Sequence, residues 1–208
     1  MKTTTRTTPT FTVPVLVALL AAAGAAQAQD TGNWLVRARA LHLDSANKDS
    51  TGLNLSVNNK TFPEVDITYF FSPSFAAELV LTYPQKHDLR SNGGKIGTLK
   101  HLPPTLLAQY HFTGLGGFRP YVGAGLNYTR FSDVKFDPAV VAALQPSIKK
   151  SSTGLALQVG VDVPVGGWLF NVDVKKVRLE TDVFAGATKA GTFKVDPVLF
   201  SVGLGKRF

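Results

Sequence analysis

The stretch that decides the fold runs from Leu102 to Phe131 and reads LPPTLLAQYHF-TGLGG-FRPYVGAGLNYTRF. The pentapeptide TGLGG has the composition of a tight turn, and the segments on either side alternate in character. Even-numbered positions are apolar or aromatic, from Leu106 to Tyr128, whereas odd-numbered positions are mostly polar or small. A period of two predicts two antiparallel strands, each with two different faces. Each segment is about 10 residues long, the length that spans a bilayer when a strand is tilted.

The same alternation recurs along the chain and predicts eight strands. They cover residues 33–42, 62–71, 75–83, 102–112, 118–131, 153–163, 168–178 and 196–208. Short connections at 72–74, 113–117 and 164–167 alternate with long ones at 43–61, 84–101, 132–152 and 179–195. Bacterial outer-membrane barrels have short periplasmic turns and long extracellular loops. The pattern therefore predicts an all-β protein, an eight-stranded antiparallel transmembrane β-barrel.

The beginning of the chain has the features of a secretory signal. Lys2 and Arg6 precede an apolar run at 13–23, and Ala26-Gln-Ala28 matches a cleavage site. We expect residues 1–28 to be a signal peptide removed after Ala28, leaving one barrel domain at 29–208. Losing Lys2 and Arg6 lowers the net charge of +8 to +6. That modest charge, without a basic run interleaved with aromatics, predicts no nucleic-acid partner.

The hairpin at 102–131 resembles the OmpW family of small outer-membrane barrels. Four further segments fit the family: Trp34 to Arg37 (WLVR), Pro63 to Phe70 (PEVDITYF), Leu155 to Asp162 (LALQVGVD) and Gly203 to Phe208 (GLGKRF). The resemblance implies an eight-stranded barrel in the bacterial outer membrane and passage of small hydrophobic molecules. The terminal Phe208 resembles the signal read by the outer-membrane assembly machinery, which we therefore expect as a partner.

Charged residues share one face of the predicted strands. Burying them in lipid would cost several kcal/mol per group, so this face must be the lumen. We expect a salt-bridged network that blocks water and ions, because eight strands enclose a space only wide enough for side chains. Its predicted members are Arg37, Arg39, Asp66, Glu78, Arg119, Asp162, Asp173 and Arg207. The alternative is that these charges are simply the core of the barrel.

The outer half of the same face is apolar. Its predicted members are Leu41, Phe62, Val80, Leu107, Phe131, Val177 and Leu199. An apolar cup, open to the outside and closed by charges below, suits a small hydrophobic solute. The alternative is a packed apolar plug beneath the loops.

Prolines near the outer end could interrupt the barrel wall, because proline cannot donate to a strand ladder. Pro63 is expected to open the second strand, and Pro103-Pro104 the fourth. They predict a lateral gap through which a captured solute leaves, or they simply mark where strands begin. In the third long connection, Asp137-Pro138 predicts the start of a short helix that ends near Pro146. The other long connections are polar and look solvated.

Aromatic residues gather at the ends of the predicted strands, as in the two girdles of membrane barrels. Beyond them, Lys176, Arg178 and Arg130 follow the lipid-facing parity at the outer end. They predict contact with outer-membrane lipid and lipopolysaccharide, or side chains that reach back to water.

Other classes of function are less well supported by the sequence. The four histidines show no spacing typical of a catalytic triad or a metal site, and the chain has no cysteine. We therefore expect neither an enzyme nor a cofactor or metal, although some barrels of this size modify lipids. A structural or receptor barrel that binds partners through its loops is the remaining alternative.

Overall fold

The computed structural model describes residues 32–208. The predicted signal peptide, residues 1–28, lies outside the described residues. The described strands and helix are β1 (Trp34–Asp44), β2 (Lys48–Asp49), β3 (Leu55–Val57), β4 (Lys60–Phe70), β5 (Phe75–Leu81), β6 (Gln85–Ser91), β7 (Gly94–Leu102), β8 (Thr105–His111), β9 (Arg119–Phe136), α2 (Pro138–Leu144), β10 (Pro146–Ile148), β11 (Ser151–Val165), β12 (Trp168–Val177), β13 (Glu180–Ala185), β14 (Thr188–Lys194) and β15 (Val198–Arg207).

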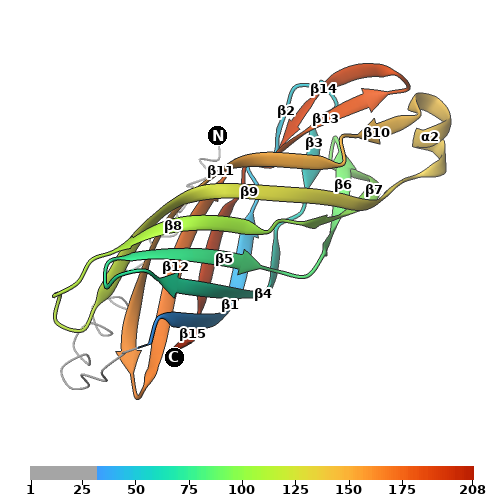
Figure 1. Cartoon of the computed structure of the whole chain (residues 1–208). Helices are drawn as coiled ribbons and strands as arrows, with labels where there is room; N and C mark the ends of the chain where they lie inside the picture. Colours follow the sequence, from blue (N-terminus) through green and yellow to red (C-terminus); the bar gives the residue numbers. More distant parts are fainter. Residues whose placement is uncertain (1–31) are drawn as a thin grey trace, which may run out of the picture.

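Eight of these strands form a closed antiparallel barrel. Neighbours pair in the order β11-β12-β15-β1-β4-β5-β8-β9, and pairing of β9 with β11 closes the cylinder. Short turns lie at one end of the barrel, and the long connections extend from the other (Figure 1). The predicted strand number, order of connections and fold class are confirmed.

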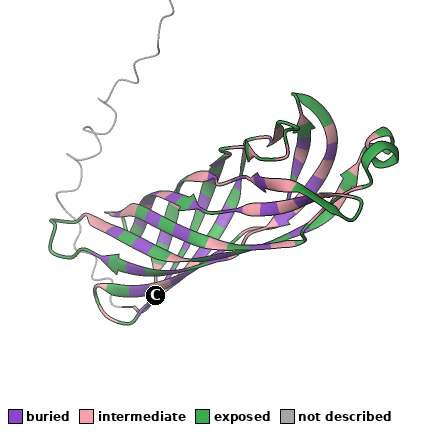
Figure 2. Cartoon of the chain, turned by 90° about the horizontal axis from the view of Figure 1, so that it is seen from above, coloured by how far each residue is buried: buried purple, intermediate pink, exposed green. Residues whose placement is uncertain are grey.

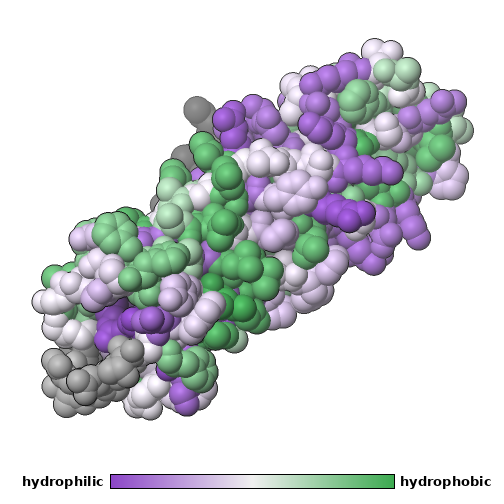
Figure 3. All heavy atoms as spheres, viewed as in Figure 1, coloured by the Kyte–Doolittle hydropathy of each residue, from purple (hydrophilic) through white to green (hydrophobic). Residues whose placement is uncertain are grey.

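The alternation of the sequence becomes the two faces of the wall. Leu106 is 58% exposed to the outside, whereas its neighbour Leu107 is 1% exposed. The same buried and exposed alternation runs along all the barrel strands in Figure 2. On the face seen in Figure 3, apolar residues gather over the middle of the barrel. The predicted parity of the hairpin is therefore confirmed, and the barrel buries its polar side chains.

Exposed aromatic side chains mark both edges of this apolar region. Trp34, Phe75 and Trp168 lie on the outer surface near the short turns, and Tyr83 and Tyr128 lie toward the long connections. Among the described residues, no helix is long and apolar enough to cross a membrane.

The long connections are more ordered than their polar composition predicts. The hairpin β6–β7 pairs with the outer part of β9, and β10, β13, β14 and β2 form a second, four-stranded sheet (Figure 1). The prediction of solvated loops was wrong, because these hairpins bury an apolar side of their own. Leu89, Leu99, Val183 and Phe193 pack together with the cup residues.

The predicted short helix is confirmed as α2. Asp137 is its N-cap residue and Pro138 its first residue, and Gln145 ends it in a left-handed conformation with φ of 44°. None of its residues is buried, and it lies at the tip of the extracellular hairpins (Figure 1).

Candidate functional site: an ionic layer beneath an apolar cup

The middle of the barrel is filled by a layer of buried charges that begins with Arg37 on β1. The Arg37 guanidinium donates through Nε and Nη2 to both carboxylate oxygens of Asp162, at 3.0 and 2.6 Å. Its Nη1 donates to Asp66 at 2.9 Å. Because β1 is not a neighbour of β11, which carries Asp162, this contact crosses the lumen.

Arg39, two residues further along β1, forms ion pairs with acidic residues of β4 and β5. Its Nη2 lies 2.7 Å from Glu64, 2.9 Å from Asp66 and 3.0 Å from Glu78. Lys175 on β12 adds a third cation, 2.5 Å from Asp173 and 3.2 Å from Glu64. The layer thus joins β1, β4, β5, β11 and β12 through ion pairs in the lumen.

Neutral polar side chains complete the layer. Gln158 Nε2 donates to Glu78 at 2.6 Å and to Asp173 at 2.8 Å. The Tyr121 hydroxyl donates to Asp173 at 2.9 Å, and the Tyr121 side chain is fully buried. Every lone pair satisfied in this way lowers the cost of keeping the charges away from water.

Six of the eight residues predicted for the charge network lie in this layer. They are Arg37, Arg39, Asp66, Glu78, Asp162 and Asp173. Arg119 and Arg207 face inward too, but they lie at the periplasmic end of the barrel. The sequence prediction left out Glu64 and Lys175, although both follow the lumen parity.

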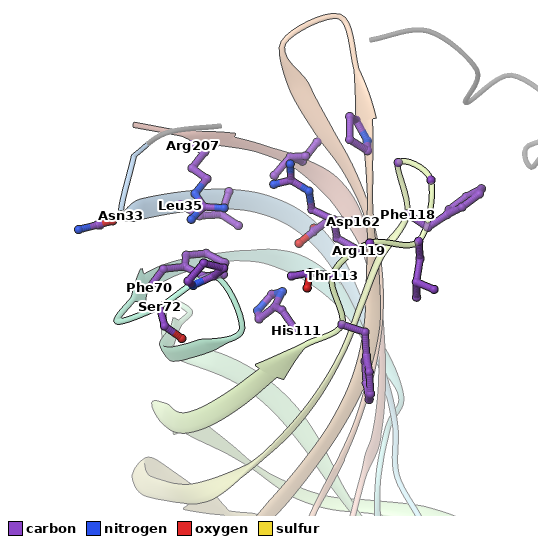
Figure 4. A pocket seen from close by; sticks show the side chains of 18 of the residues that line it. Asn33, Leu35, Phe70, Ser72, His111, Thr113, Phe118, Arg119, Asp162 and Arg207 are labelled. Carbon is purple, nitrogen blue, oxygen red and sulfur yellow. The ribbon is translucent and has the colours of Figure 1, made fainter. Parts of the chain in front are cut away.

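A pocket of about 840 Å³ opens between the periplasmic turns. Arg119, Arg207, His111, Asp162 and Phe70 are among the residues that line it (Figure 4). The Arg207 guanidinium lies 4.0 Å from the centre of the Phe70 ring, and its Nε donates to the Gly32 carbonyl at 2.5 Å. The ionic layer, through Asp162, forms the inner wall of this pocket.

The predicted cup residues lie together on the extracellular side of the ionic layer. Leu41, Phe62, Val80, Leu107, Phe131 and Val177 are all 5% exposed or less, and Leu199 is half-buried. The extracellular hairpins pack onto them, so the cup is filled in this structure. Small cavities remain around the cup, among them one of about 20 Å³ and one of about 10 Å³. Leu43, His101 and Leu179 line both of them.

The larger cavity adjoins an interruption in the barrel wall. Pairing of β4 with β5 ends at Val65 and Leu81, and pairing of β5 with β8 ends at Val80 and Thr105. Residues 82–84 and Pro103-Pro104 lie beyond these pairs, and Thr82 and Pro103 line the cavity. Pro103-Pro104 precedes β8, as predicted.

Pro63 differs from its prediction. It does not open a strand but lies within β4, where it pairs with Ala40 of β1. Its position is still beyond Val65, the last β4 residue paired with β5. No β5 residue pairs with Pro63. The missing amide donor of Pro63 therefore breaks no hydrogen bond between β4 and β5.

The comparisons with known proteins agree with this architecture. A model of the OmpW family matches residues 30–208. The chain belongs to the OmpW family. Outer membrane protein W of Escherichia coli strain K12 is 34% identical over 209 residues, covering 95% of this chain and 99% of the relative. The bacterial outer membrane is therefore the location of this barrel.

A solved structure and a second relative extend the comparison. The OmpW-family barrel matches the crystal structure of the outer membrane protein OprG from Pseudomonas aeruginosa with a TM-score of 0.74 and 28% identity. That match covers 85% of this chain and 96% of OprG. The dibenzothiophene metabolism operon protein PahQ of Pseudomonas aeruginosa is 32% identical over 120 residues, 56% of this chain and 54% of PahQ.

Proposed function

We propose that this OmpW-family barrel takes up small hydrophobic molecules from the extracellular side and releases them sideways into the membrane. One observation carries the proposal. An apolar cavity lies directly on the ionic layer, because Glu64 and Lys175 belong to the layer and also line the cavity. A solute that enters the cup from outside thus meets apolar walls and a charged floor.

The charged floor closes the straight route to the periplasm. Arg37, Asp66 and Glu78 are fully buried, and the ion pair of Arg37 with Asp162 links strands that are not neighbours across the lumen. Moving an apolar molecule through this layer would separate buried charges, which costs several kcal/mol for each broken pair, roughly 3–5 by mutational measurements. For such a solute, moving into the membrane beside the cup costs less free energy than crossing the ionic layer.

The wall beside the cavity offers the lateral route. Between Val65 of β4 and Thr105 of β8, the ladders that hold β5 in place have ended. Transfer of apolar surface from water into hydrocarbon is favourable by about 25 cal/mol per Å², so the overall movement of a solute from the outside into the membrane needs only an opening, not an energy source. Pro103 and Pro104, which lack amide donors, lie at this opening.

The relative PahQ supports the same class of solute. Its name places it in an operon for dibenzothiophene metabolism, and dibenzothiophene is a flat aromatic molecule with little polarity. The match covers about half of PahQ, so this support concerns the chemistry of the solute and not its identity.

The filled cup also favours a second candidate, a structural or receptor barrel. A cavity of about 20 Å³ holds about one water molecule, and a drug-sized ligand needs roughly 300 Å³ or more. Uptake therefore requires the hairpins β6–β7 and β13–β14 to move away from the cup. A receptor barrel would not need this movement. The family and its barrel neighbours do not favour a lipid-modifying enzyme.

Uptake of dibenzothiophene separates these candidates. The protein is placed in vesicles whose outer leaflet is lipopolysaccharide. Entry of dibenzothiophene into these vesicles is followed by the fluorescence of the compound. We expect the protein to speed entry, and Leu107→Gln to reduce that gain by about tenfold, because the amide must be desolvated in the cup. Leu106→Gln, one position along and facing lipid, is the matched control. Equal entry with and without protein would favour the structural or receptor barrel.

A further inference from the structure

Three polar atoms around the larger cup cavity have no hydrogen-bond partner within residues 32–208. They are Oε2 of Glu64, Oγ1 of Thr82 and Nε2 of His101, each with almost no solvent access. They come from three separate parts of the chain, β4, the segment after β5, and β7. Buried polar atoms in proteins are nearly always bonded to protein or water, so this cluster indicates a missing partner.

Neighbouring groups position these side chains when the hairpin β6–β7 is closed. The second oxygen of Glu64, Oε1, pairs with Arg39 at 2.7 Å and with Lys175 at 3.2 Å. The His101 ring stacks on the His87 ring, with centroids 4.6 Å apart. Most of the remaining wall is apolar and includes Leu41, Phe62 and Val177, while Lys175, Asn127 and Thr105 add further polar groups. In the closed form the site therefore combines a polar corner with a mainly hydrophobic lining, and His101 returns to this corner when the hairpin β6–β7 closes over a bound solute.

We propose that the cup selects mainly apolar molecules that carry one hydroxyl group, and that Glu64, Thr82 and His101 bind this hydroxyl. The inference rests on the proposed function and narrows its solute class to hydrophobic alcohols. A hydroxyl has one hydrogen to donate and two lone pairs. It donates to the Glu64 carboxylate and accepts from the Thr82 hydroxyl and the His101 imidazole N–H.

Other head groups fit this corner less well. A carboxylate would meet the negative charge of Glu64, and an ammonium group would meet Lys175, which also lines the cavity. A plain hydrocarbon would displace the water that fits in about 20 Å³ and leave all three polar atoms unbonded. The apolar tail of an alcohol would extend toward the second cavity, which shares Leu43, His101 and Leu179 with the first.

Binding of 1-decanol and decane tests the inference. The protein, carrying ¹³C-labelled Leu and Val methyl groups, is placed in lipid nanodiscs and titrated with each probe at matched mole fractions. The methyl shifts of Val80, Leu107 and Val177 report occupancy of the cup. We expect half-saturation with decanol at about a tenfold lower mole fraction than with decane. Thr82→Val and His101→Phe should each remove most of this preference, and the lipid-facing Thr153→Val should keep it.

The outcomes separate this inference from the proposed function. Equal half-saturation for decanol and decane, with the cup methyls shifted by both, overturns the hydroxyl site and leaves hydrophobic uptake standing. A preference for decanol that survives Thr82→Val and His101→Phe also overturns the site. If neither probe shifts the cup methyls, both the site and the uptake proposal are wrong.

Discussion

Arg37 binds Asp162 across the barrel interior through two parallel hydrogen bonds. Nε and Nη2 of the guanidinium lie 3.0 and 2.6 Å from the two carboxylate oxygens. Arg37 belongs to β1 and Asp162 to β11, which are separated in the barrel by β12 and β15 on one side. The pair therefore ties strands that are not neighbours together across the lumen, at the inner wall of the periplasmic pocket.

Removal of this arginine should destabilise the barrel strongly. In Arg37→Met, the carboxylates of Asp162 and Asp66 stay buried without their main partner, which costs roughly 3–5 kcal/mol. The free energy of unfolding, measured by urea titration of the barrel in detergent, should fall by that order. The double variant Arg37→Met/Asp162→Leu should recover much of the loss, because it removes the uncompensated charge.

Arg178→Met serves as the control for side-chain loss. Arg178 is exposed on the outer surface, so its replacement should leave unfolding unchanged. Equal destabilisation by Arg37→Met and Arg178→Met would mean that the ionic layer contributes nothing specific to the fold.

The barrel wall was predictable from the sequence because strand parity is a local property. Leu106 and Leu107 are adjacent, yet one faces lipid and the other is buried, as the alternation of their neighbours indicates. Parity gives the face of a residue but not its height. The sequence placed Arg119 and Arg207 on the lumen face in the periplasmic half or middle of the barrel, and only the structure shows that they line the periplasmic pocket.

The extracellular hairpins were missed for a different reason. His87 and Leu89 alternate with polar neighbours in β6, but the segment is short, charged and flanked by other polar residues. What makes it a strand is pairing with β7, which in turn lies on β9. Such long-range pairing leaves little trace in the local sequence.

Glycine at position 160 should prove necessary for the ionic layer. A Cβ added to Gly160 would approach the Tyr121 ring, with Cε1 at 2.9 Å and the hydroxyl closer still. Gly160→Ala must therefore displace Tyr121 and its bond to Asp173, which lowers the free energy of unfolding by about 1–3 kcal/mol. Ala108→Val, which adds methyl groups on the lipid-facing side, is the control. A Gly160→Ala barrel as stable as the original would show that Tyr121 has room to move.

Acid should loosen the hairpin β6–β7, because His87 and His101 are buried there beyond the outer aromatic girdle. Burial lowers the pKa of His87, and burial together with the neighbouring His87 lowers the pKa of His101 to about 3. An open hairpin would titrate near the ordinary value of about 6.5. As the pH falls from about 6.5 toward about 3, the open form binds protons first, so the closed form loses stability.

Hydrogen exchange of peptides covering residues 85–101 measures this effect. After correction for the intrinsic dependence of exchange on pH, protection should be lower at pH 4.5 than at pH 7. The double variant His87→Phe/His101→Phe should abolish the difference. The surface pair of Asp88 and Lys95, 2.8 Å apart, should not mask the effect, because Lys95 lowers the pKa of Asp88. Protection that is the same at both pH values in the original chain would refute the prediction.

Restored amide donors at the wall interruption should slow lateral release. Pro103→Ala/Pro104→Ala restores two N–H groups where the β5 ladders have ended. The Pro104 carbonyl accepts from Tyr128 of β9, so the donor at position 103 is the one that can face residues 82–84. New hydrogen bonds there would extend the wall across the opening beside the cavity. We expect the rate of dibenzothiophene entry into lipopolysaccharide-faced vesicles to fall by up to about tenfold. One additional hydrogen bond that must break for the wall to open, at about 1.4 kcal/mol, corresponds to a factor of ten.

Pro120→Ala is the matched control, because Pro120 lies in β9 near the periplasmic end, where it pairs with Val161 of β11. Its replacement should leave entry unchanged. Melting curves of all three proteins establish that each barrel is folded. If the folded Pro103→Ala/Pro104→Ala protein admits the solute at the original rate, the interruption is no exit. The solute would then have to cross the ionic layer, and the Arg37→Met barrel would be expected to admit it faster.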